Sequence, residues 1–137
     1  MVRSSPSAAL QLDLKGESDE LLDATVALLK QEHALERAII QLKNPIRIRK
    51  IRSQEPTARI LARVRDMGEL RQAIASGVEF IELERWITGN AIEEAHAADI
   101  PVVLNVAAPQ YDTEVTWNFF RSKGVDSIMT DHAVKAR

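Results

Sequence analysis

Apolar and polar residues follow two different periods along this chain, and the two periods alternate from end to end. Leu10–Leu14 alternates apolar with polar residues, which is the period of a strand. After Ser18, a residue type that favours helix N-caps, leucines recur at helical spacing. The predicted strands span residues 10–14, 38–42, 58–64, 78–83, 101–106 and 125–130. The predicted helices span about 18–29, 44–54, 68–76, 90–98 and 113–123.

Residues with strong local preferences mark the ends of several of these segments. Asn44 followed by Pro45 is typical of a helix start. Gly77 and Gly124 suit the position after a helix, where the backbone often adopts a positive φ. Residues 101–106 are nearly all apolar, which favours a strand covered on both faces.

The spacing of the strands predicts how they pair. They begin 20 to 28 residues apart, and each interval has room for one helix. Parallel strands need a crossover of about a dozen residues or more, so this rhythm predicts an α/β domain with a parallel sheet. A doubly wound nucleotide-binding sheet usually shows a glycine-rich turn after its first strand, whereas the turn at 15–18 holds one glycine. A barrel is the better match.

The first strand has one apolar and one polar side. In a barrel the apolar side faces the helices and the polar side faces the lumen. An edge strand with one solvated face shows the same pattern, and on pattern alone the two alternatives weigh equally. The two sides are Leu10, Leu12 and Leu14, and Gln11, Asp13 and Lys15. We expect a partial TIM-like (β/α) barrel of about six parallel strands over residues 10–132, with a frayed lead-in at 1–9 and a tail at 133–137.

Composition narrows the classes of function. The 137 residues carry a formal net charge of −2 and 4% aromatic residues, which does not favour a nucleic-acid partner. The basic run at 47–52 is interleaved with isoleucines and is interpreted as a solvated helix face. Cysteine is absent, which excludes disulfides, thiolate metal ligands and cysteine nucleophiles. No apolar run reaches the roughly 18 residues of a membrane span, and the start does not resemble a signal peptide. A cytoplasmic location is therefore expected.

Candidate chemistry lies where the predicted strands end, because the carboxyl ends of barrel strands form the mouth that carries active sites. These positions are Asp13, Lys15, Arg63, Glu82, Glu84, Asn105, Thr130 and Asp131. Asp13 and Lys15 are two residues apart on one strand, so their side chains point to the same side. A carboxylate beside an ammonium suits a divalent cation and a phosphate. The alternative is a simple ion pair without a ligand.

Two runs of sequence resemble the glycerophosphodiester phosphodiesterases. Leu12-Asp13-Leu14-Lys15 resembles the strand of that family that carries a carboxylate, an apolar residue and a lysine. The run from Gly124 to His132, with Gly-Val-Asp leading to Thr-Asp, resembles the last strand of the family. Residues 58–64 and 78–83 fall in register with its middle strands. The resemblance covers about residues 10–132 and implies a barrel whose first two family strands are missing here.

The resemblance implies metal-dependent hydrolysis of a glycerophosphodiester to an alcohol and glycerol phosphate. It places Asp13 as one ligand of a divalent cation, Mg²⁺ or Ca²⁺, and Lys15 as the phosphate-binding lysine. Asn105 and Glu82, at two further strand ends, are expected to take part in binding the substrate, a small phosphodiester.

Several family motifs have no counterpart in the sequence. The family places His-Arg-Gly, Glu-x-Asp and His-Asp before the point where this chain begins. His33, His96 and His132 do not replace its two catalytic histidines, and packing, solvated or loop roles are expected for them. The isolated chain is therefore expected to be impaired or inactive. The alternatives are a non-catalytic module that binds a phosphate ligand or a partner, and one piece of a barrel that another chain completes. Open sheet edges also predict a homodimer.

Overall fold

A computed structural model describes residues 9–16, 18–83, 89–108 and 110–132, and in these residues strands and helices alternate. The strands are β1 (Leu10–Asp13), β2 (Ala38–Leu42), β3 (Arg59–Val64), β4 (Phe80–Leu83), β5 (Val102–Asn105) and β6 (Ser127–Met129). The helices are α1 (Asp19–Gln31), α2 (Pro45–Gln54), α3 (Met67–Ala75), α4 (Asn90–Ala97) and α5 (Glu114–Ser122), with a short 3₁₀ helix, η2 (Leu35–Arg37), before β2. Every predicted strand and helix is present, and η2 is an addition to the prediction.

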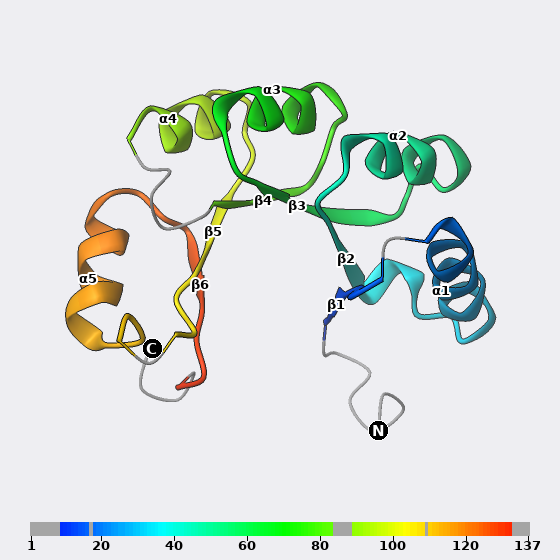
Figure 1. Cartoon of the computed structure of the whole chain (residues 1–137), viewed down its shortest axis with the longest axis horizontal. Helices are drawn as coiled ribbons and strands as arrows, with labels where there is room; N and C mark the ends of the chain where they lie inside the picture. Colours follow the sequence, from blue (N-terminus) through cyan, green and yellow to red (C-terminus); the bar gives the residue numbers. More distant parts are fainter. Residues whose placement is uncertain (1–8, 17, 84–88, 109, 133–137) are drawn as a thin grey trace.

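The six strands form one parallel sheet in the order in which they occur along the chain, β1-β2-β3-β4-β5-β6. A doubly wound sheet would reverse the direction of strand addition, whereas this sheet grows in one direction only. Figure 1 shows that the sheet curls into an arc with the five helices on its outer side, and that the arc is open between β1 and β6. The chain is therefore a partial (β/α) barrel, as the sequence predicts.

The main hydrophobic core lies between the outer face of the sheet and the helices. Ile40, Ile60 and Ile81 on successive strands are fully buried there and pack in one cluster with Leu22 of α1 and Leu70 of α3. Each fully buried aliphatic side chain of this kind stabilises the fold by about 1.5–3 kcal/mol. Because side chains alternate along a strand, the residues directly before and after each of these isoleucines face the inside of the arc.

The local signals in the sequence act as predicted. The Ser18 hydroxyl accepts a hydrogen bond from the backbone N–H of Leu21, and the Asn44 side chain accepts one from that of Ile46. Gly77 and Gly124 have φ of 64° and 91°. These positive values are a conformation that favours glycine.

The interpretation of residues 47–52 as a solvated face holds for Arg49, which is exposed, but is wrong for Arg47 and Arg52. The Arg47 side chain is only 8% exposed, and it donates to the backbone carbonyls of Gly16 and Ser18. The Arg52 guanidinium donates to carbonyls after α2 and before β4. Both cations are anchored because the turns that connect strands and helices expose carbonyls that need donors.

Some predictions fall on residues outside the described part of the chain. These are the lead-in over residues 1–8, the tail at 133–137, and the position of Glu84. Trp117 of α5 is buried in the core. Among the described residues, none of the helices has the length and apolar character that a bilayer crossing demands.

Candidate functional site at the carboxyl ends of the strands

Asp13 and Lys15 lie together at the end of β1. The Lys15 ammonium donates to the Asp13 carboxylate, and the two side chains are 84% and 31% exposed, respectively. Asp13 pairs in register with Gln41 of β2. The next residue along β2, Leu42, belongs to the outer core, so Gln41 faces inward. The pair therefore projects from the inner, polar side of the arc at its mouth, as the sequence predicts.

A chain of polar side chains runs along the inner face from β1 to β4. Gln11 donates to Gln41 at 3.1 Å, and Gln41 donates to the Glu82 carboxylate at 2.5 Å. The Arg63 guanidinium lies 3.6 Å from the other oxygen of Glu82. Glu82 is only 1% exposed, and a buried carboxylate is costly unless it is hydrogen-bonded or paired. These contacts give Glu82 a structural role, and its substrate-binding role stays a prediction.

Asn105 ends β5 on the same inner face, opposite Met129 of β6. Its side-chain oxygen accepts a hydrogen bond from the backbone N–H of Ala107 at 3.1 Å, which shapes the turn that follows the strand. Asn105 is half-buried at the mouth. Its substrate-binding role also stays a prediction.

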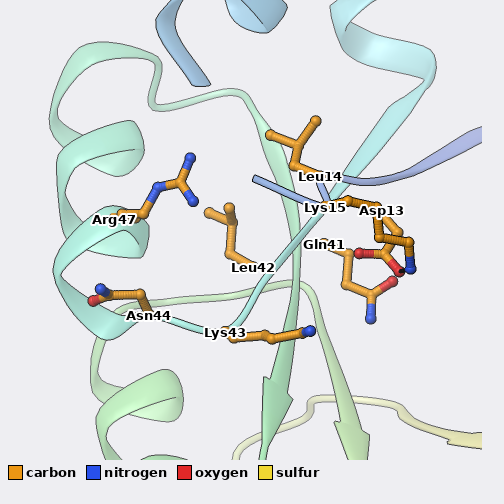
Figure 2. Close-up of a pocket in the computed structure, with 8 residues that line it drawn as sticks. All are labelled: Asp13, Leu14, Lys15, Gln41, Leu42, Lys43, Asn44 and Arg47. Carbon is orange, nitrogen blue, oxygen red and sulfur yellow. Dashed lines mark hydrogen bonds and ion pairs between the residues drawn. The ribbon is translucent and has the colours of Figure 1, made fainter. Parts of the chain in front are cut away.

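A small pocket lies between the ends of β1 and β2 and the start of α2 (Figure 2). Its lining residues are Asp13, Leu14, Lys15, Gln41, Leu42, Lys43, Asn44 and Arg47. Lys43 and Gln41 are absent from the candidates named from the sequence. The rule that found the others would have found Lys43, because it is the first residue after a predicted strand. Gln41 lies inside its strand, and only the strand register places it beside Asp13.

The position of Thr130 at a strand end suggests a role in the site, but its contacts are structural. Its hydroxyl donates to the Asp112 carboxylate, which also accepts from the backbone N–H of Asp131 and the indole N–H of Trp117. Burial raises the pKa of Asp112, but these hydrogen bonds more than offset it and lower the pKa below the ordinary value. Asp112 therefore ties the end of β6 to α5. No local pattern marks this loop residue, because its partners lie on two other segments.

The histidines do not assemble at the inner face. His33 follows α1 with φ of 51°, and His132 follows β6 and is exposed. The His96 ring lies 2.8 Å from the Asp126 carboxylate at the opposite, amino-terminal edge of the sheet. Among the described residues, no histidine lies on an inner-face strand position.

The described residues do not by themselves fit a divalent cation. They contain no group of three or more His, Cys, Asp or Glu side chains that could hold a metal ion. Asp13 supplies one carboxylate, whereas Mg²⁺ and Ca²⁺ take six or more oxygen ligands. We therefore derive no chemical step through a metal, and the cation stays a prediction.

The Gly-Val-Asp run that carries part of the resemblance has a role in the fold. The Asp126 carboxylate accepts from the backbone N–H of Val102, the first residue of the neighbouring strand β5, at 2.7 Å. Residues 77–79 repeat the pattern as Gly-Val-Glu, and there Glu79 accepts from the N–H of Ile60 in β3 at 2.7 Å. In both places the acid joins two strands at the amino-terminal edge, opposite the mouth. This motif is therefore evidence for the fold rather than for catalysis.

Six parallel strands in sequence order, helices on one side and polar side chains on the other define a partial (β/α) barrel. This fold is shared with glycerophosphodiester phosphodiesterases of known structure. A protein from Galdieria sulphuraria assigned to that class superposes with a TM-score of 0.83 at 16% identity, over 98% of this chain and 59% of that one. A glycerophosphoryl diester phosphodiesterase from Parabacteroides distasonis gives 0.81 at 17% identity, over 98% and 51%.

A solved structure with a different name also matches. FabK from Thermotoga maritima gives a TM-score of 0.63 at 13% identity, over 94% of this chain and 43% of that one. No protein-family model matches the sequence, and no curated protein matches it significantly. At these identities the similarities establish the fold alone. This chain spans between half and three-fifths of the two phosphodiesterases, so the activity of a whole barrel is a matter for proposal.

Proposed function

We propose that this chain forms part of a glycerophosphodiester phosphodiesterase-type barrel and that its mouth binds the phosphate group of a glycerophosphodiester or of glycerol phosphate. The observation that carries the proposal is the Asp13–Lys15 pair, which projects from the inner face at the mouth. The sequence resemblance implies the same two residues for cation and phosphate binding. The fold comparisons agree with the proposal, because glycerophosphodiester phosphodiesterases share the barrel.

We propose further that the chain by itself hydrolyses such diesters poorly or not at all. General acid–base catalysis contributes about 10²- to 10⁴-fold to the rate of such reactions. Among the described residues, no histidine lies on an inner-face strand position, and no group of three or more His, Cys, Asp or Glu side chains could hold a metal ion. The proposed contribution of the chain is therefore to bind and orient the phosphate.

A turnover assay combined with a binding measurement tests the proposal. We expect no hydrolysis of glycerophosphocholine above background with Mg²⁺ or Ca²⁺, and measurable binding of glycerol 3-phosphate by calorimetry. Metal-dependent turnover that Asp13→Ala abolishes would show that the chain is a competent phosphodiesterase. Absence of binding for both compounds at millimolar concentrations would refute the proposal.

A second candidate function is a non-catalytic module that binds phosphate ligands. The described residues favour it to the extent that they hold no three-ligand metal group. Supplying the missing part of the barrel in trans distinguishes the two, because a module stays inactive whereas a phosphodiesterase piece gains turnover that depends on Asp13. The cytoplasmic location stays a prediction from the sequence.

A further inference from the structure

The pocket at the ends of β1 and β2 is lined by three cationic side chains that differ in their partners. The Lys15 ammonium is paired with the Asp13 carboxylate. The Arg47 guanidinium is bound to loop carbonyls and lies 3.8 Å from the Asp19 carboxylate. Within the described part of the chain, Lys43 has neither a hydrogen bond nor an ion pair with its side chain. Of the three cationic side chains that line the pocket, Lys43 is therefore the one whose charge no partner in the described part of the chain compensates.

The position of Lys43 directs this charge to the inner side of the arc. Leu42 belongs to the outer core and is 2% exposed, so the residues on either side of it, Gln41 and Lys43, face inward. Figure 2 shows the Lys43 side chain extending to the side of Gln41 and away from Arg47. The register that pairs Asp13 with Gln41 brings Lys15 level with Lys43 when it is continued by two residues.

We infer that Lys43 is a phosphate-binding residue of this mouth and that it contributes more to the affinity than Lys15. The inference rests on the proposed function and refines it. A phosphate that binds Lys15 must compete with the Asp13 carboxylate and must approach that carboxylate, which repels it. Lys43 is exposed and carries neither cost. The ligand class is a phosphate anion, either a monoanionic diester or a dianionic monoester, and the dianion is attracted more strongly.

Calorimetric titration with glycerol 3-phosphate and with glycerophosphocholine tests the inference in the intact chain. We expect Lys43→Gln to weaken binding of glycerol 3-phosphate about tenfold, the size expected for one hydrogen bond to a charged group. Lys43→Arg keeps the charge and should bind within about threefold of the parent, which is a small free-energy difference. Lys123→Gln removes another exposed lysine, the C-cap residue of α5, and controls for general charge effects.

The role of Lys15 is measured separately with the double variant Asp13→Asn/Lys15→Gln, which removes the ion pair and leaves the net charge unchanged. If Lys43 is the main contact, this variant loses less affinity than Lys43→Gln, and amide chemical shifts change around Lys43 when ligand is added. If the double variant loses the affinity and Lys43→Gln does not, the inference is overturned while phosphate binding at the mouth stands. If the parent chain binds neither compound, the inference and the proposed function both fail. Thermal unfolding of each variant verifies that it is folded.

Discussion

The Gln11 amide nitrogen lies 3.1 Å from the Met129 sulfur, although 118 residues separate them in sequence. Gln11 is in the first strand of the sheet and Met129 in the last, so this contact spans the inside of the arc that Figure 1 shows. The same Gln11 amide donates to Gln41 at 3.1 Å, which begins the polar chain that ends at Glu82. Side-chain contacts on the inner face therefore connect the last strand, through Gln11 and Gln41, to Glu82.

We predict that the inner polar chain stabilises the fold through Glu82. Glu82→Ala removes the acceptor for the buried Gln41 amide and the carboxylate beside Arg63. The free energy of unfolding in urea should fall by about 2 to 3 kcal/mol. Glu82→Gln keeps an acceptor and should lose only about 1 kcal/mol. A loss below about 0.5 kcal/mol for Glu82→Ala would contradict this assignment.

We predict that Arg52 holds the amino-terminal edge of the sheet together. Its guanidinium donates to the carbonyls of Pro56, Ala58 and Gly77 and to both oxygens of Glu79. Arg52→Ala should lower the free energy of unfolding by about 2 to 3 kcal/mol, since several charge-assisted hydrogen bonds are lost. Arg52→Lys should recover only part of this, because an ammonium does not reproduce the planar fork. Chemical denaturation measures both, and full recovery by lysine would show that charge alone matters.

We predict that Asp126 makes the stability depend on acid pH. Burial raises the pKa of Asp126, but hydrogen bonds from the Val102 N–H and the His96 ring outweigh it and bring the pKa below the ordinary 3.8. A lowered carboxyl pKa adds stability that is present above the unfolded pKa and is lost as the pH falls through the folded pKa. Asp126→Asn should therefore lower the stability at neutral pH. As the pH falls from about 4 to about 2, this variant should lose less stability than the parent chain.

Thermal unfolding at a series of pH values tests this prediction. The Asp126 side chain is 44% exposed, so the effect is partly screened by solvent and salt. Parallel curves for the parent and Asp126→Asn across the acid range would contradict it.

The two sides of α1 differ in a way that bears on assembly. Asp19, Asp23 and Lys30 form ion pairs with residues of α2 or with Glu55 just after it, which orients that side of the helix toward α2. At 100° per residue, Leu21 and Leu28 lie on the opposite side, which faces the opening of the arc. They are 40% and 58% exposed, on the helix that follows β1, an edge strand of the sheet.

We therefore predict that the isolated chain self-associates through this side of α1 and the edge of β1, because an exposed apolar helix side and a strand edge that no other described strand covers both favour pairing with a second copy. Leu21→Glu/Leu28→Glu should shift the sedimentation coefficient toward that of a monomer. Val115→Glu on α5, where Val115 is 81% exposed, is the matched control and should leave the association unchanged. A parent chain that sediments as a monomer at all concentrations would contradict the prediction.

Much of the fold can be predicted from the sequence, because the patterns that mark strands and helices are local. The alternation in residues 10–14, the N-caps at Ser18 and Asn44 and the glycines at 77 and 124 each act within a few residues of themselves. Signals of this kind place every predicted strand and helix to within two or three residues of its bounds in the structure, whereas η2 is not predicted. The parallel direction of the strands also follows from the sequence, because each interval between successive strands holds one helix, and such a crossover joins parallel strands.

The residues of the candidate site can be predicted only in part from the sequence. Asp13 and Lys15 are found because two residues on one strand must point the same way, and Lys43 is missed although it obeys the same strand-end rule. Glu82 and Thr130 are found by position, yet the structure gives both of them structural partners, Gln41 and Asp112, that no sequence pattern indicates. The Gly-Val-Asp run looks like a functional signature and instead joins two strands at the edge away from the mouth.

By itself, the sequence determined which segments are strands and helices and that the strands run parallel, since periodicity and capping depend on neighbours along the chain. The curl of the sheet and its register decided which polar side chains of different strands meet on the inner face, and brought Lys43 level with the Asp13–Lys15 pair. Such contacts depend on distances between segments that are 30 to 118 residues apart in sequence. Those distances exist only once the outer core has packed and fixed each strand against the next.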